Sequence, residues 1–226
     1  MALTMIVLFP SFFFRHQRLG SLEEIAEIFG IALILFGQLI RTSARGYKSE
    51  QSQNGHALIQ GGPYSLVRNP MYLGILLIGL GIVLILFQWW VMAVFLIVFI
   101  IRYLLLIFKE EKKLLEVFSG QYKTYQGKVP RLILPLTMLL QADISEYLPL
   151  KLSWLKKEIG TILAVLLMTL LVESWEDISY QGIKVYFEEV ILILVIIIIF
   201  ISLVVYLIRR TNKLSTNVTT KSKAAL

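Results

Sequence analysis

Two apolar stretches of membrane length, residues 71–87 and 89–108, are separated only by Gln88. A helix that crosses a bilayer needs about 20 mostly apolar residues. Two such helices joined by so short a link must be antiparallel neighbours, and Gly79 and Gly81 would let their backbones approach closely. Helices satisfy their backbone hydrogen bonds internally, as lipid requires. The pair therefore predicts a helical membrane protein.

Other apolar stretches extend this pattern. Residues 25–40, 154–172 and 190–208 each predict a further membrane helix. Residues 1–14 are apolar but short and lack the basic leader and cleavage site of a signal peptide, so we expect them in the mature protein. Beyond the hairpin, helical spacing of apolar and aromatic residues predicts a helix over 111–125. The sequence thus predicts an all-α polytopic membrane protein with about five to six membrane segments.

Charge is distributed unevenly between the loops. Residues 41–68, residues 109–157 and the tail after residue 208 are rich in Lys and Arg, whereas residues 173–189 are acidic. The positive-inside rule places the basic regions, including the C-terminus, in the cytoplasm and the acidic loop outside. A net charge of +7 then favours contact with anionic lipid headgroups. No soluble segment interleaves basic and aromatic residues, so we expect no nucleic-acid partner.

Thiol chemistry and metal sites built from Cys or from several His are excluded by the composition. The chain has no Cys, which rules out disulfides, thiolate catalysis and Cys-ligated metals. Its two histidines, His16 and His56, are too few for a His-rich metal site. We therefore expect no metal.

A polar cassette, residues 56–74, ends where the hairpin begins. It contains Arg68, followed by Asn69 and Pro70, and proline suits the first turn of a helix. Arg68 should therefore lie beside a helix N-terminus, where backbone N–H groups favour an anion. Position alone fits a positive-inside anchor equally well.

Glu110 and Glu111 lie at the far end of the hairpin, which brings them to the same bilayer face as Arg68. Exposed helix ends often carry such mixed charge runs, and solvation is their commonest explanation. The functional alternative is that one carboxylate binds ribose hydroxyls or an ammonium group. Neighbours on a helix point about 100° apart. We expect one carboxylate to face Arg68 and the other to contact a structural partner, such as Lys112, Lys113 or a backbone donor.

The order and spacing of these residues resemble a known family. The pattern is His56-x-Leu58-Ile59-x-x-Gly62-x-Tyr64-x-x-x-Arg68-Asn69-Pro70-x-Tyr72-x-Gly74, then the hairpin, Glu110-Glu111, and a segment with Phe118, Tyr122, Tyr125 and Val129-Pro130. Over residues 56–135 it resembles the isoprenylcysteine carboxyl methyltransferases and their phospholipid methyltransferase relatives. The family usually has His after the arginine, whereas this chain has Asn69, which cannot become cationic.

The resemblance implies an integral membrane enzyme that uses S-adenosylmethionine to methylate a lipophilic acceptor, such as an isoprenoid carboxylate or a lipid amine. It implies a cytoplasmic cofactor site, with Arg68 and Glu111 as candidate catalytic residues. The cofactor-binding residues that it implies are His56, Tyr64, Arg68, Asn69, Tyr72, Glu110 and Glu111.

Three regions follow from this assignment. Residues 1–150 would form the methyltransferase core, with the motifs in 56–135. Residues 151–210 would add a pair of membrane helices without a counterpart in the family pattern. Residues 211–226 are polar and rich in Ser, Thr and Lys, so we expect a disordered tail.

Two other functions stay open. A similar cassette occurs in NADPH-dependent membrane sterol reductases, although those chains are usually much longer. A non-catalytic membrane binding protein could also retain the fold. Binding of S-adenosylmethionine, of NADPH or of neither would distinguish the three, and the sequence does not indicate an oligomeric state.

Overall fold

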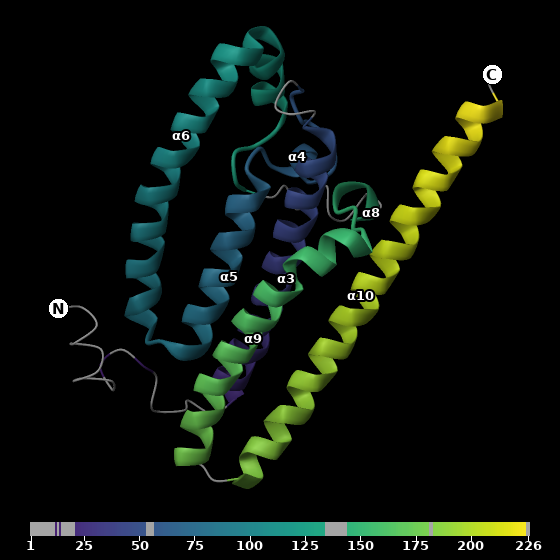
Figure 1. Ribbon diagram of the computed structural model, residues 1–226. Coiled ribbons are helices and arrows are strands. Elements are labelled where there is room, and N and C mark those ends of the chain that lie inside the picture. The colour runs from purple at the N-terminus through teal and green to yellow at the C-terminus, as the bar shows by residue number, and fades with distance from the viewer. Residues whose placement is uncertain are drawn as a thin grey trace. The chain divides into compact units, whose positions relative to one another are not determined.

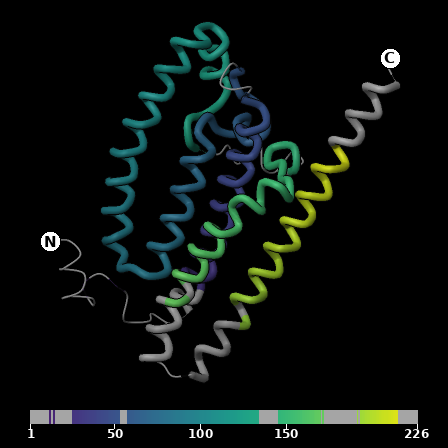
Figure 2. Tube along the Cα trace, in the orientation of Figure 1, coloured from purple at the N-terminus to yellow at the C-terminus, as the bar shows by residue number. Residues whose placement is uncertain are grey.

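The computed structural model describes Phe12, Phe14 and residues 21–52, 57–133, 144–180 and 183–224. These residues form helices and no β-strand, with one isolated bridge between Phe14 and Phe87. The prediction of an all-α polytopic membrane protein is confirmed. Figure 1 traces the helices, and Figure 2 follows the same path as a Cα tube. In chain order they are α3 (Ser21–Gln51), α4 (Pro63–Leu66), α5 (Pro70–Leu86), α6 (Trp89–Lys128), α8 (Ile144–Tyr147), α9 (Leu152–Tyr180) and α10 (Ile183–Ala224).

Three of the described helices have a part long and apolar enough to cross a membrane: Ile25–Gln51 in α3, Trp89–Lys128 and Ile193–Leu214 in α10. Helix α5 is as apolar but has only 17 residues. In the most apolar windows of α6 and α10 only 11% of residues are buried, so their large apolar side chains are available to lipid. The total of five to six segments stays a prediction. The short segment 1–14 lies outside the described residues, except for Phe12 and Phe14.

The chain divides into two compact units, each made of three separate stretches. The first unit contains residues 1–38, 75–103 and 160–200. Its core is apolar and centres on Ile31, Ile34, Leu35, Ile85 and Leu86. Because these side chains are apolar, the helices are held together by close packing rather than by hydrogen bonds or ion pairs.

Glycines allow the close packing of the first unit. A Cβ added to Gly81 would lie 2.4 Å from the carbonyl oxygen of Gly30, so α3 and α5 touch through their backbones. A Cβ on Gly79 would lie 2.3 Å from the Phe95 ring, which places α5 directly against α6. The predicted neighbours α5 and α6 and the packing role of Gly79 between them are therefore confirmed, whereas Gly81 packs α5 against α3 and not against α6.

The second unit contains residues 39–74, 104–159 and 201–226. Its decisive feature is a break inside α6 at Ser119, whose φ of 32° and ψ of −103° are not helical. The chain reverses there, as Figure 1 shows near the end of α6. The helix predicted over 111–125 is thus present but not continuous, and its second part, residues 120–128, folds back.

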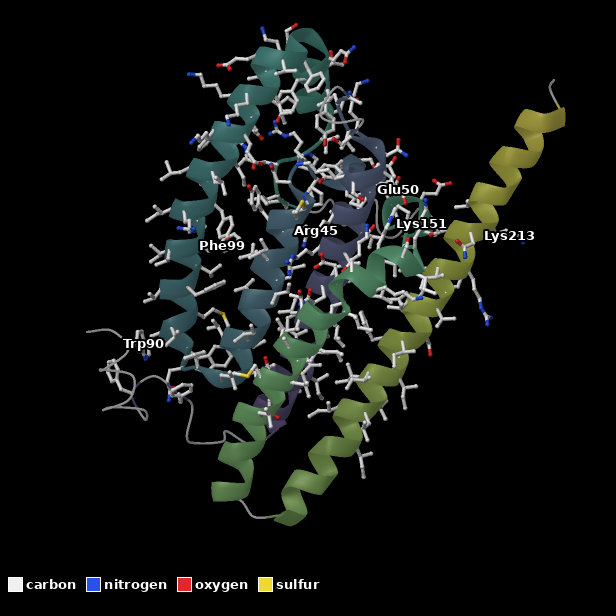
Figure 3. All side chains as sticks on the ribbon, in the orientation of Figure 1. Arg45, Glu50, Trp90, Phe99, Lys151 and Lys213 are labelled. Carbon is white, nitrogen blue, oxygen red and sulfur yellow. The ribbon has the colours of Figure 1, made fainter. Side chains whose placement is uncertain are left out.

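Polar contacts in the second unit fasten the start of α9 to the end of α3. The Arg45 Nη1 lies 2.6 Å from the buried Glu158 Oε1. Lys151 Nζ and Trp154 Nε1 donate to the two oxygens of Glu50 at 2.5 and 2.7 Å. Figure 3 labels Arg45, Glu50 and Lys151 in this region. The start of α9 is therefore tied to the part of the chain that precedes the cassette.

Helix α10 joins the same unit through Thr211. The Leu150 N–H donates to Thr211 Oγ1 at 3.0 Å, and that hydroxyl donates to the Leu207 carbonyl at 2.8 Å. The helix then continues to Ala224, through residues for which the sequence predicts disorder. Residues 211–226 contain no Gly or Pro to end it. The division of the chain at residues 150 and 210 stays a prediction.

Candidate active site

The cassette enters the second unit through a short turn. Gly62, at the N-cap of α4, has a φ of 56°, which favours glycine. A Cβ there would lie 2.9 Å from the Tyr47 ring, and a Cβ on Gly61 would lie 2.6 Å from the Tyr47 hydroxyl. Both glycines therefore let the chain pass close to α3 and deliver Tyr64 and Arg68 to the site.

Arg68 lies two residues before α5, which begins at Pro70 as predicted. Its backbone N–H donates to the Pro130 carbonyl at 2.8 Å. Its side chain is only 9% exposed, and its Nη1 lies 3.3 Å from Glu111 Oε1. Nε and Nη1 are nevertheless buried without a hydrogen-bond acceptor among the described residues. Buried polar groups are nearly always satisfied, so these two nitrogens are donors that a further acceptor could use.

Glu111 is the centre of the charge cluster and is 4% exposed. Arg131 holds both of its oxygens, with Nε 3.2 Å from Oε1 and Nη2 2.9 Å from Oε2. Gln126 Nε2 adds a longer contact of 3.4 Å to Oε2. This hydrogen bonding to Glu111 raises the pKa of Arg131. The cluster of Arg68, Arg131 and Glu111 thus carries two positive charges and one negative charge.

Glu110 has different surroundings. It is exposed, and its Oε1 accepts a 2.8 Å hydrogen bond from the Tyr72 hydroxyl. Burial raises the pKa of Tyr64, and the negative charge of Glu110 raises it further. The structure therefore separates the adjacent carboxylates as expected, with Glu111 toward Arg68. The partner of Glu110 is Tyr72, rather than a lysine or a backbone donor.

The folded-back part of α6 completes the site. Tyr122 and Tyr125 lie on it, 1% and 5% exposed, with ring centroids 5.9 Å apart. The Tyr125 hydroxyl donates to the Tyr64 carbonyl at 2.5 Å. Asn69 Nδ2 donates to the Arg131 carbonyl at 3.2 Å. Asn69 therefore has a structural hydrogen bond at the position where the family usually has His.

Two groups of predicted residues are thus brought together: Arg68 with Glu111, and Tyr72 with Glu110. Arg131 and Gln126 were not predicted for the site. The only sequence signal for Arg131 was its position directly after Val129-Pro130. His56 lies outside the described residues. In the part of the chain that the structure describes, no group of three or more His, Asp or Glu could hold a metal.

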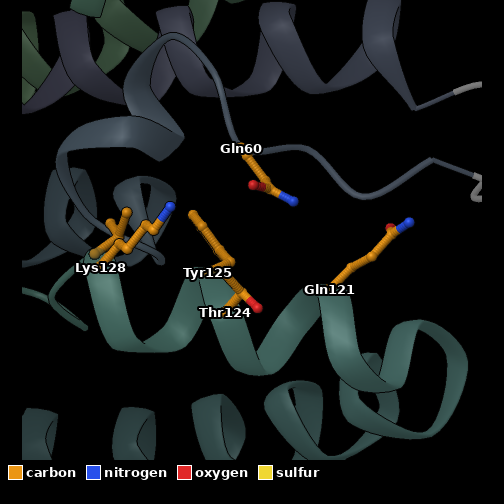
Figure 4. Close-up of a pocket in the computed structure, with 6 residues that line it drawn as sticks. Gln60, Gln121, Thr124, Tyr125 and Lys128 are labelled. Carbon is orange, nitrogen blue, oxygen red and sulfur yellow. The ribbon is translucent and has the colours of Figure 1, made fainter.

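A cavity of about 430 Å³ lies over the other face of the folded-back helix (Figure 4). Its lining includes Gln121, Thr124, Tyr125 and Lys128, spaced three or four residues apart as on one helix face, and Gln60 from the cassette. Tyr122 and Gln126 lie on another face of this helix, toward Glu111. Tyr125 therefore borders the cavity and also anchors the Tyr64 turn.

Comparisons with known proteins match the part of the chain that carries most of these residues. The phospholipid methyltransferase family model matches residues 25–121, which include α5, Arg68, Glu110 and Glu111. The chain is also 30% identical over 133 residues to Protein-S-isoprenylcysteine O-methyltransferase of Saccharomyces cerevisiae. That match covers 54% of this chain and 56% of the yeast protein, so the chain spans about half the length of this relative. No solved structure matches significantly. Both matches confirm the predicted resemblance to the isoprenylcysteine carboxyl methyltransferase and phospholipid methyltransferase superfamily.

Proposed function

We propose that this chain is an S-adenosylmethionine-dependent membrane methyltransferase that acts on a lipophilic acceptor. The observation that carries the proposal is the guanidinium of Arg68, which is buried and has two nitrogens without a hydrogen-bond acceptor among the described residues. With Arg131 and Glu111 it forms a cluster of net charge +1. One ligand carboxylate would neutralise that charge and use the donors.

The chemistry of the remaining residues fits the rest of such a cofactor. The exposed carboxylate of Glu110 can accept from an ammonium group or from ribose hydroxyls. Tyr72 holds that carboxylate in place through its hydroxyl. Tyrosine rings nearby offer faces to a cation. When bound, S-adenosylmethionine supplies a methyl group activated by its sulfonium.

The chain itself acts mainly by positioning. Arg68 would fix the carboxylate end of the cofactor, and Glu110 its ammonium or ribose. Arg131 engages both oxygens of Glu111, which supports a role for Glu111 in holding the arginines rather than in accepting a proton. Methyl transfer to a carboxylate needs no general base, and orientation supplies much of its rate. An isoprenoid carboxylate is therefore the favoured acceptor class, and a lipid amine is the other.

A calorimetric titration tests which cofactor binds. The purified protein in lipid nanodiscs is titrated with S-adenosylmethionine and, separately, with NADPH. We expect binding of the first and none of the second. NADPH binding would favour the sterol-type reductase, and binding of neither would favour a non-catalytic protein. Transfer of a labelled methyl group to an S-farnesylcysteine probe or to phosphatidylethanolamine then tests the acceptor class.

A further inference from the structure

Arg131 is fastened to the residues that precede α5. The Arg68 N–H donates to the Pro130 carbonyl at 2.8 Å, and Asn69 Nδ2 donates to the Arg131 carbonyl at 3.2 Å. Its guanidinium carbon lies 4.6 Å from the centroid of the Phe108 ring. Backbone and side chain are therefore both held, which fixes where the Arg131 guanidinium can point.

Glu111 lies between two guanidinium groups, but its contacts with the two are unequal. Arg131 engages both carboxylate oxygens, at 3.2 and 2.9 Å. Arg68 has one contact of 3.3 Å that lacks hydrogen-bond geometry, and its Nε and Nη1 have no acceptor among the described residues. Two-point arginine–carboxylate pairs are the stronger and more directional kind. Arg131 thus holds both oxygens of Glu111 in hydrogen bonds, whereas Arg68 keeps only an ion-pair contact with that carboxylate.

We infer that Arg131 is a positioning residue that keeps the guanidinium of Arg68 free for the carboxylate of the ligand. Without Arg131, Glu111 would turn its present ion-pair contact with Arg68 into hydrogen bonds and occupy the donors that the ligand uses. The cluster would then have no net charge, and a carboxylate would bind weakly. This inference rests on the proposed function and assigns Arg131 a role that it exerts through Glu111.

The test compares two ligands. One is S-adenosylmethionine, and the other is 5′-methylthioadenosine, which has the nucleoside but neither carboxylate nor ammonium. We expect Arg131→Ala to lower the affinity for S-adenosylmethionine more than tenfold. The affinity for 5′-methylthioadenosine should stay within about twofold of the wild-type value. The double variant Arg131→Ala, Glu111→Gln removes the competing carboxylate, and we expect it to recover at least fivefold of the lost affinity. Arg209→Ala, at an exposed arginine of α10, is the matched control.

The outcomes separate the two proposals. Unchanged affinity in Arg131→Ala would overturn the positioning role, and so would equal losses for both ligands or a double variant no better than the single one. Equal losses for both ligands, or no recovery in the double variant, would show that Arg131 is only structural. If Arg131→Ala does not fold, Arg131→Gln, which keeps much of the side chain, is measured with the same two ligands. If the wild-type protein binds neither ligand, the proposed function itself falls.

Discussion

The hydroxyl of Tyr125 donates a 2.5 Å hydrogen bond to the carbonyl oxygen of Tyr64, which lies 61 residues earlier in the chain. This contact joins the folded-back part of α6 to the cassette. Tyr125→Phe removes only the hydroxyl, so we expect a lower unfolding temperature and a loss of about 1 kcal/mol, the usual size for one hydrogen bond. Thermal unfolding in detergent measures it. Tyr206→Phe, at an exposed tyrosine of α10, should unfold at the wild-type temperature.

Arg68→Ala removes the donors assigned to the ligand carboxylate. We expect cofactor binding to fall below detection while the protein stays folded, because losing a buried charge-assisted pair costs on the order of 2–5 kcal/mol of affinity. Calorimetry measures the cofactor affinity, and thermal unfolding shows whether the variant is folded. An unchanged dissociation constant would restore the interpretation of Arg68 as a membrane anchor.

Glu110→Gln and Glu111→Gln should have different effects. Glu110 is exposed and bonded to Tyr72, so its change should cost more than tenfold in cofactor affinity and little stability. Glu111 is buried between Arg68 and Arg131, so its change should mainly destabilise the protein, by about 1–3 kcal/mol. Lys112→Gln, on the same turn and exposed, is the control. If both glutamate variants bind and unfold like the wild type, the pair is only a solvated helix end.

Gly46 on α3 packs against Trp154 on α9. A Cβ added to Gly46 would lie 2.1 Å from Cδ2 of that ring, so Gly46→Ala should destabilise the protein by about 1–3 kcal/mol through overpacking. Gly160→Ala is a matched change inside α9, where a Cβ meets nothing within 4 Å. It should be neutral or stabilise slightly, because alanine is the better helix former. Equal effects of the two changes would argue against the α3–α9 contact.

Topology can be measured with single cysteines, since the native chain has none. The positive-inside rule predicts that Gln88→Cys and a cysteine within residues 173–189 react with a membrane-impermeant thiol reagent from outside. Ser215→Cys, in the C-terminal tail, should react only after the membrane is opened. Labelling of Gln88→Cys solely from the cytoplasmic side would reverse the predicted orientation.

The sequence predicted those parts of the site that depend on the hairpin. Pro70 marks the start of α5, and the Gln88 link predicts that Arg68 and Glu111 lie on the same side of the membrane. Both follow from local rules for helix starts and from span length. They predict that one of the two carboxylates meets Arg68, and the structure identifies it as Glu111.

Arg131 could not be predicted because its position depends on a reversal of the chain. Helical periodicity over residues 111–125 continues through Ser119, so the pattern predicts an unbroken helix that would carry Tyr125 and Arg131 away from Glu111. The Ser119-Gly120 dipeptide was the available signal, since Ser-Gly often marks a turn. The stronger helical pattern on either side of it nevertheless favours a continuous helix. Tertiary contacts with Glu111 and Tyr64 hold the reversed segment.

The reversal at Ser119 also bears on how the chain folds. The ion pair of Glu111 with Arg131 closes a loop of only 20 residues, and the entropy lost on closing a loop grows with its length. Both partners, and Arg68 before them, leave the ribosome ahead of α9 and α10. The ion pair of Glu111 with Arg131 can therefore form between residues close in the sequence, before the C-terminal helices are synthesised.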